Sequence, residues 1–215
     1  MECVGTWQIE KWAGPAAEFH AMTLPPRRCL WAVTPERPAL VLGSSQSMSV
    51  INMARAEEIG IDVVSRRSGG GAVWLDPAQT VWIDIVIPSS DSLWVDDVPR
   101  SMLWLGRAFA QILDDDTDVF DGRYEATDLA RDYCFGGRAP GEVMRHGAKV
   151  VGISQRRTKD SARFQCVAYR SYDTDVVASL FLDPARAQSV RETTVGLVPD
   201  SLTDVVGALS RAIPG

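Results

Sequence analysis

Apolar residues recur with a period of two along much of this chain, which indicates a protein rich in strands. Residues 81–87 show this most clearly, because valine and isoleucine at the odd positions share one face while Trp82, Asp84 and Val86 share the other. Shorter apolar segments between turn residues predict the other strands, at 29–33, 39–42, 62–65, 128–133, 141–145, 149–154 and 163–169. The Arg-His-Gly-Ala sequence at 145–148 predicts a hairpin turn between two of them.

Three segments carry apolar residues at helical spacing instead. The first is 48–59, which Gly60 ends. The second begins at Pro99 and repeats large apolar residues on one face up to Ile112, and the third is 201–213. Strands lie in groups before and after helices, so we expect an α+β fold with mixed, largely antiparallel sheets and packed helices.

The bulk properties fit one globular domain, residues 1–215. The formal net charge is −6, without the basic stripe typical of nucleic-acid binding. The chain has no run of about 18 apolar residues that would predict a membrane span. Glu2, Glu10 and Lys11 interrupt the N-terminus before a signal-peptide core forms. We therefore expect a cytoplasmic protein that binds neither nucleic acid nor membrane.

Cysteine and histidine show no pattern typical of a metal centre. Neither His20 nor His146 has a cysteine or carboxylate nearby at metal-ligand spacing, so we expect no zinc site. The cysteines form no Cys-x-x-Cys pair, and we expect each to be a free thiol: Cys3, Cys29, Cys134 and Cys166.

The segment from Arg66 to Ala72, Arg-Arg-Ser-Gly-Gly-Gly-Ala, is the most unusual in the chain. Consecutive glycines allow backbone N–H groups to converge on an anion and allow a ligand to approach the main chain closely. Arginines beside such a loop are bidentate partners for phosphate or carboxylate. The same residues also fit an ordinary glycine-rich hairpin, and the residues alone leave both interpretations open.

A lysine lies near the start of a second informative segment, Gly147 to Gln155. Lys149 precedes Val150 and Val151 in an apolar strand, and partial desolvation would let its charge act at close range on a carbonyl or phosphoryl oxygen. The alternative is a lysine at the rim of a hairpin that extends into water.

Four motifs, in the expected order, make the chain similar to the catalytic domain shared by lipoate–protein ligases, octanoyl or lipoyl transferases and, more distantly, biotin–protein ligases. They are 42–46 followed by Asn52, the glycine stretch 63–73, Thr127-Asp128, and 147–155. The resemblance covers about residues 30–195 and implies a biotin/lipoate ligase-like catalytic domain, without the C-terminal accessory domain of many lipoate ligases. The chain lacks the Gly-Arg-Gly-Arg loop of biotin ligases, which favours the lipoate branch.

The resemblance also implies roles for individual residues. Lys149 would contact the acyl carbonyl, or the phosphate ester of an acyl-adenylate, and offset charge in the transition state. Asp128 would stand near the nucleotide or its metal. The acyl group or its activated phosphate would be bound by Arg66, Arg67, Ser68, Gly69, Gly70, Gly71 and Ala72, and by Gln46, Gly152 and Ser154.

Three places depart from the ligase pattern. Trp74-Leu75-Asp76 stands where ligases often carry a histidine, Gln165-Cys166-Val167 replaces a histidine–glycine pair, and Thr127 replaces an asparagine. These departures bear on nucleotide binding above all. ATP and Mg²⁺ are therefore expected only if the chain acts as a ligase.

Cys134 suggests a different route. The sequence Tyr-Cys-Phe-Gly-Gly at 133–137 is similar to the cysteine–phenylalanine loop of one class of octanoyl transferases, in which the cysteine takes the acyl group as a thioester without ATP. A free cysteine titrates near about 8.5, so Cys134 would need a cationic neighbour, Lys149 or Arg131, to react as a thiolate. The alternative is a small buried apolar residue.

The sequence therefore predicts an enzyme that attaches a lipoyl or octanoyl group to a specific lysine of a lipoyl carrier domain. Three forms stay open: an ATP-dependent lipoate–protein ligase, an ATP-independent octanoyl or lipoyl transferase using Cys134, and a non-catalytic acyl-binding or partner-dependent paralogue. The expected partners are a lipoyl carrier domain or acyl-carrier protein, and an accessory protein subunit in the third case. All forms require the glycine loop to lie opposite Lys149 with an acyl-sized slot between them.

Overall fold

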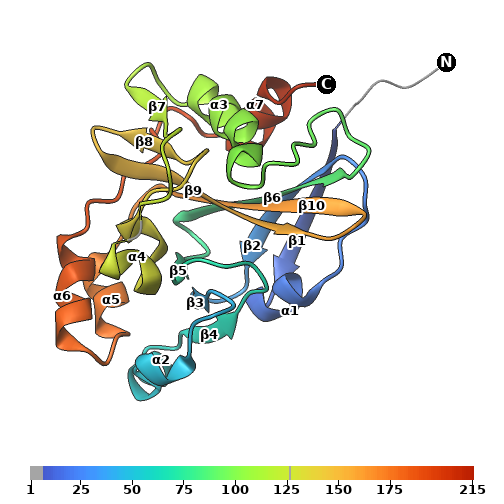
Figure 1. The fold of residues 1–215 in the computed structure, drawn as a ribbon. Coiled ribbons are helices and arrows are strands. Elements are labelled where there is room, and N and C mark those ends of the chain that lie inside the picture. Colours follow the sequence, from blue (N-terminus) through green and yellow to red (C-terminus); the bar gives the residue numbers. More distant parts are fainter. Residues whose placement is uncertain (1–6, 126) are drawn as a thin grey trace.

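The computed structural model describes residues 7–125 and 127–215, which form a large and a small β-sheet (Figure 1). The large sheet has the strand order β1-β2-β6-β10-β9-β8-β7, and the small sheet has the order β4-β3-β5. Neighbouring strands are antiparallel except in the pairs β1–β2 and β3–β4, so the predicted α+β class is confirmed. The strands are β1 (Gln8–Gly14), β2 (Cys29–Pro35), β3 (Ala39–Leu42), β4 (Asp62–Ser65), β5 (Val73–Leu75), β6 (Thr80–Pro88), β7 (Thr117–Val119), β8 (Val143–Arg145), β9 (Ala148–Arg157) and β10 (Ser161–Tyr169).

Helices cover one side of the large sheet, and the small sheet lies against the other (Figure 1). Helices α3 and α7 pack on the first side. Of the described helices, none combines the length and the apolar character needed to cross a membrane. The α-helices are α1 (Ala16–Ala21), α2 (Met53–Glu58), α3 (Leu103–Ile112), α4 (Asp128–Asp132), α5 (Thr174–Ser179), α6 (Pro184–Glu192) and α7 (Val205–Ala212), and the 3-10 helices are η1 (Met48–Val50), η2 (Pro99–Met102) and η3 (Cys134–Gly136).

Both faces of β6 are buried along most of its length, and its residues alternate between the two faces as the sequence predicts. Ile83 and Ile85 of β6 belong to the core that contains Leu105 and Phe109 of α3, whereas Trp82 belongs to the core around the small sheet. Burying a large apolar side chain is worth about 1.5–3 kcal/mol, so both sets of contacts hold the strand in register.

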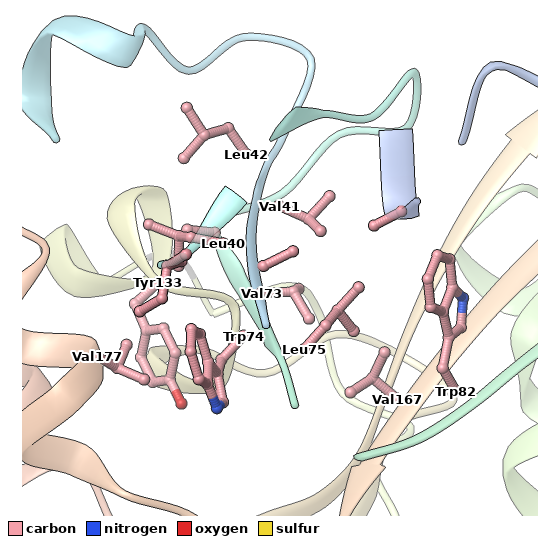
Figure 2. Close-up of a cluster of buried hydrophobic side chains, with 14 of the residues drawn as sticks. Leu40, Val41, Leu42, Val73, Trp74, Leu75, Trp82, Tyr133, Val167 and Val177 are labelled. Atoms are coloured by element: carbon pink, nitrogen blue, oxygen red, sulfur yellow. The ribbon is translucent and has the colours of Figure 1, made fainter. Parts of the chain in front are cut away.

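The small sheet forms the opposite wall of the second core. Figure 2 shows Val41 of β3 and Val73 of β5 on the side of the small sheet nearest Trp82 and Val167 of the large sheet. Trp74, which alternates with Val73, lies on the far side of β5 (Figure 2). The space between the two sheets is thus lined mainly by apolar side chains.

Two sequence predictions need correction. Residues 128–133 do not form a strand, because α4 occupies 128–132 and Thr127 caps it by accepting a hydrogen bond from the Ala130 amide (2.9 Å). The helix predicted at 48–59 is broken into η1 and α2, since Asn52 caps α2 by accepting from the Arg55 amide (3.1 Å). The other predicted elements are present within a few residues, including the turn at 145–148, where His146 has φ 48°.

Candidate functional site

The glycine loop, residues 66–72, connects β4 to β5, and hydrogen bonds from its first residue, Arg66, hold it together. The guanidinium of Arg66 is buried and donates to the carbonyls of Gly69 (2.9 Å) and Gly71 (2.8 Å) inside the loop, and to that of Val41 (3.1 Å) in β3. Arg67, by contrast, is exposed. The structure therefore gives the two arginines different surroundings, and Arg66 holds the loop in shape.

The glycines allow backbone segments to touch. A side chain on Gly43 would overlap the carbonyl oxygen of Gly70, and one on Gly71 would lie 2.6 Å from the carbonyl carbon of Tyr133. The close approach is stabilised by hydrogen bonds from the Ala72 amide to the carbonyl of Asp132 (2.9 Å) and from the Cys134 amide to the carbonyl of Ala72 (2.9 Å). The glycine loop is thus joined directly to the segment that carries Cys134.

Gln46 strengthens the same junction. Its Oε1 accepts from the Gly43 amide (2.9 Å), and its Nε2 donates to the carbonyls of Arg131 (3.1 Å) and Asp132 (3.0 Å). The side chain of Arg131 is exposed. Gln46 therefore links the end of β3 to α4 from the outside of the loop.

Ser68 extends the loop toward the large sheet. Its Oγ donates to Oε1 of Gln165 in β10 (2.6 Å) and lies 3.2 Å from Oγ of Ser154 in β9. The amide nitrogen of Gln165 is 3.1 Å from Nδ1 of His20, so the amide donates and the imidazole proton is on Nε2. Burial, then the charges of Arg163 and Arg66, lower the pKa of His20 to about 3, which makes it a neutral ring. Gln165 and His20 are site residues that the motifs did not identify.

Lys149 is buried and does not extend into water. Its Nζ donates to the backbone carbonyl of Cys134 (2.6 Å) and to Oε1 of Glu142 (2.8 Å), and it lies 5.4 Å from the ring centre of Phe135. The side chains of Lys149 and Glu142 are 2% and 3% exposed. Desolvation makes this charge pair electrostatically stronger than a surface pair.

Glu142 was missed in the sequence, although the hairpin contains the signal for it. The turn at 145–148 pairs Met144 with Lys149, which brings Glu142 to the lysine from the facing strand. Burial raises the pKa of the Glu142 carboxyl, and the charge and hydrogen bond of Lys149 oppose this rise. The second oxygen, Oε2, accepts from the Ala139 amide (2.8 Å).

Two pockets meet at Cys134. The first, here the apolar pocket, is a narrow space between the two sheets, lined by His20, Val41, Arg66, Val73, Leu75, Trp82, Cys134, Phe135, Gly152, Ser154, Gln165 and Val167. The second, here the glycine-loop pocket, is wider and is bordered by Gly69, Gly70 and Gly71 and by Glu142 and Lys149. Cys134 and Ser154 line both pockets. The glycine loop and Lys149 therefore share one pocket, as the sequence predicted.

Cys134 and the buried side chain of Arg66 line the same apolar pocket. Burial lowers the pKa of the Arg66 guanidinium, and Cys134 and then Tyr169 act in the opposite direction. Cys29, Cys134 and Cys166 are free thiols, as predicted, and of these three only Cys134 is not fully buried. Cys3 lies outside the described residues. Of the cations near Cys134, Lys149 binds its backbone carbonyl and Arg66 lines the same pocket as its thiol, whereas Arg131 is exposed.

The Thr127-Asp128 motif lies at the start of α4. Thr127 caps the helix and also donates to the carbonyl of Gly136 (2.9 Å), which attaches α4 to the cysteine segment. Asp128 is the first residue of α4, and its side chain lies outside the described part of the structure. Among the side chains that are described, no three His, Cys, Asp or Glu residues gather as a metal ion would require.

Three solved structures that share this fold have between 14% and 18% sequence identity to the chain. An archaeal bipartite lipoate protein ligase from Thermoplasma acidophilum, studied with its E2 lipoyl domain, has 18% identity and a TM-score of 0.67, with 95% of this chain and 81% of that chain covered. A T. acidophilum protein with bound lipoic acid has 16% identity and a TM-score of 0.72, with coverage of 97% and 83%. Lipoate-protein ligase A bound with ATP has 14% identity and a TM-score of 0.65, with coverage of 96% and 81%.

Sequence comparison gives the family. None of the curated proteins compared with the chain matches it. The family model for the lipoyl protein ligase A/B catalytic domain, however, matches residues 12–214, which include the glycine loop, Cys134 and Lys149. Because the match spans nearly the whole chain, the chain belongs to the lipoyl protein ligase A/B catalytic domain family.

Proposed function

We propose that this chain transfers an octanoyl or lipoyl group to a lysine of a lipoyl carrier domain, and that Cys134 holds the group as a thioester on the way. The observation that carries the proposal is the position of Cys134 at the meeting of the apolar pocket and the glycine-loop pocket. An acyl tail in the apolar pocket would place its carbonyl near this thiol. Leu75, which stands where ligases often carry a histidine, and Val167 line the apolar pocket, whose cavity of about 30 Å³ an acyl tail would have to widen.

The reaction would take place in two acyl exchanges. In the first, the Cys134 thiolate attacks the carbonyl of an acyl thioester donor, a new C–S bond forms, and the donor leaves as a thiolate that takes up a proton. In the second, the neutral amine of the carrier lysine attacks the enzyme thioester. The C–N bond forms, the C–S bond breaks, and the amine proton passes to the Cys134 thiolate. The activation of the donor is thus conserved without ATP.

Lys149 would stabilise the oxyanion in both exchanges. A buried ammonium such as that of Lys149 acts more strongly on a developing negative charge than one in bulk solvent. Its Nζ donates a hydrogen bond to the backbone carbonyl of Cys134, the residue that carries the reacting sulfur. The glycine loop on the other side of the pocket lets the acyl group approach the backbone without a steric clash.

An ATP-dependent ligase is the second candidate. Lys149 also borders an outer pocket, lined in part by Thr127, Arg138 and Thr194, which offers space for a larger head group on the far side of the lysine. A structural neighbour is a lipoate-protein ligase bound with ATP. In this route the lysine would stabilise the phosphate ester of an acyl-adenylate. Bound Mg²⁺ would supply charge neutralisation for the triphosphate, and Asp128 is the residue we expect near it.

Intact-mass spectrometry separates these routes. The purified chain is incubated with a lipoyl-domain acceptor and either an octanoylated acyl-carrier protein or lipoate with Mg-ATP. Cys134→Ala is compared with Cys29→Ala, a matched loss of a thiol from the core around the small sheet. We expect octanoyl transfer without ATP and a hydroxylamine-labile mass increment on the enzyme that Cys134→Ala removes and Cys29→Ala retains.

Each other outcome has a definite meaning. Modified acceptor that appears only with lipoate and Mg-ATP, in wild type and Cys134→Ala alike, contradicts the thioester route and supports the ligase. No modified acceptor with either donor contradicts both enzymes. The chain would then be an acyl-binding paralogue or one that needs an accessory subunit, as in the bipartite archaeal ligase among its structural neighbours.

A further inference from the structure

The site contains an amine beside the position proposed for the thioester. Nζ of Lys149 lies 2.6 Å from the backbone carbonyl oxygen of Cys134, the residue that would carry the acyl group. A neutral amine at this position would attack the thioester carbonyl, form a C–N bond, expel the Cys134 sulfur and pass its proton to that thiolate. The product would be a stable amide on Lys149 and an enzyme without its oxyanion partner. An ammonium has no lone pair and cannot react in this way.

Glu142 is placed to prevent this side reaction. Its Oε1 accepts a hydrogen bond from the Lys149 ammonium at 2.8 Å, and its Oε2 accepts one from the Ala139 amide at 2.8 Å. Both oxygens therefore accept hydrogen bonds, which favour the ionised carboxylate and oppose the effect of burial on the pKa of Glu142. The two side chains are almost completely shielded from water, so each is the other's main source of compensating charge.

Close backbone contacts and a hydrogen bond fix the position of the backbone around Glu142. Gly141 has φ +91°, and a side chain there would lie 2.7 Å from a backbone atom of Met102. A side chain on Gly106 of α3 would overlap the carbonyl oxygen of Gly141. The Phe120 amide donates to the Glu142 carbonyl (2.9 Å), which fixes the segment from the other side. The carboxylate is thus held against the lysine by α3 and the strand pair β7–β8.

Other ionisable groups surround the pair, but Glu142 is in direct contact with the lysine. Arg138 lies beside both pockets and pairs with Glu125 at 3.9 Å. The remaining ionisable side chains that line the two pockets around Lys149 are Tyr124, Cys134 and His146. The Glu142 carboxylate thus supplies the negative charge at hydrogen-bond distance from Nζ.

We propose that Glu142 is a built-in counter-ion that keeps Lys149 an ammonium, so that the acyl group passes to the carrier's lysine and not to the enzyme's own. The proposal rests on the proposed acyl-transfer function. It assigns Glu142 as a positioning residue, which acts on the reaction through Lys149.

The test uses Glu142→Gln, which keeps the size and the hydrogen-bond acceptor but removes the charge. Wild type and variant are incubated with the octanoyl thioester of N-acetylcysteamine, without carrier, and then treated with hydroxylamine, which cleaves thioesters and leaves amides. Peptide mass spectrometry locates the remaining octanoyl groups. We expect at least a tenfold greater octanoyl-amide occupancy at Lys149 in the variant than in wild type. The exposed Lys11 and Lys159 report the chemical background in the same sample.

A control variant accounts for general effects of losing a buried carboxylate. The side chain of Asp91 is 4% exposed and pairs with Arg28 at 2.6 Å, and it lines neither of the pockets that Lys149 borders. Asp91→Asn should therefore show the wild-type pattern of acylation. Octanoyl-lysine at 149 in wild type, or equal amounts in wild type and Glu142→Gln, overturns the proposal.

A second measurement does not depend on catalysis. Trace labelling with acetic anhydride gives the reactivity of Lys149 relative to Lys11 and Lys159, and we expect the ratio to rise in Glu142→Gln and to stay unchanged in Asp91→Asn. An unchanged reactivity ratio in Glu142→Gln overturns the proposed role of Glu142 as the counter-ion of Lys149. If the ratio rises but wild type forms no octanoyl thioester at Cys134, the counter-ion stands and the proposed function fails.

Discussion

Replacing Lys149 by methionine should destabilise the fold as well as remove activity. Methionine retains much of the apolar stem but leaves the Glu142 carboxylate buried without its cation. The pair is 2% and 3% exposed, so the remaining charge would have little access to water. Removing one partner of a buried ion pair typically costs about 3–5 kcal/mol. Loss of an oxyanion partner should in addition lower turnover by about 10²–10³-fold.

The loss of stability should depend on pH with a definite sign. Burial already raises the pKa of Glu142, and Lys149→Met removes the charge that opposes this rise. A carboxyl with a raised pKa in the folded state disfavours folding once the unfolded chain ionises, above an ordinary value of about 4.3. The penalty of the variant relative to wild type should therefore be larger at pH 8 than at pH 5.

Urea unfolding followed by tryptophan fluorescence measures these free energies. The double variant Lys149→Met/Glu142→Gln removes the uncompensated charge and should recover a large part of the lost stability at pH 8. A single variant as stable as wild type at pH 8, or a double variant no more stable than the single one, would contradict the buried pair. Activity lost without any change in stability would mean that Lys149 is not tied to Glu142 in solution.

Two further predictions concern the walls of the site. Gly71→Ala should lower the free energy of unfolding by about 1–3 kcal/mol, because the new methyl group would press on the Tyr133 backbone. A methyl group on Gly69 would have no atom within 4 Å, so Gly69→Ala should change this free energy by less than about 0.5 kcal/mol. Equal urea midpoints for the two variants would contradict the close approach of Gly71 to Tyr133. His20 has a pKa lowered to about 3, so wild type should lose stability as the pH falls below about 6.5, by up to about 1.4 kcal/mol per pH unit from this group. His20→Phe should flatten the pH dependence of the unfolding free energy between pH 7 and 5, and an unchanged slope would refute the neutral buried ring.

Local pattern predicted the parts of the fold in which one physical signal dominates. The alternation around Ile83 and Ile85 predicted a strand with two faces, and β6 buries one face against α3 and the other against the small sheet. The pattern was misleading at 128–133, because the hydrogen bond of the Thr127 cap favours a helix that apolar spacing did not reveal. Short elements depend on such single contacts more than long ones do.

Motif order predicted that the glycine loop lies near Lys149, but not what each residue contacts. The glycine loop and Lys149 do line one pocket, although they are far apart in the chain. The sequence left open an anion-binding loop and an ordinary glycine-rich hairpin. The loop does not join a hairpin, because β4 and β5 lie on opposite sides of β3, and its glycines pack closely against backbone and border the pocket. Arg66 could be placed beside the loop from sequence, yet its three carbonyl partners come from the folded backbone.

By itself the sequence determined the family, the strand-rich α+β class and the residue types available for acyl chemistry, because these depend on local composition, spacing and motif order. Only the tertiary structure decided that Lys149 is buried against Glu142 and that Cys134 lies where two pockets meet. Those contacts depend on the register of the β8–β9 hairpin and on glycine positions that let α3 and the cysteine segment approach their neighbours. Such approaches join residues distant in the chain, and their energies appear only when the backbone brings the groups together and excludes water.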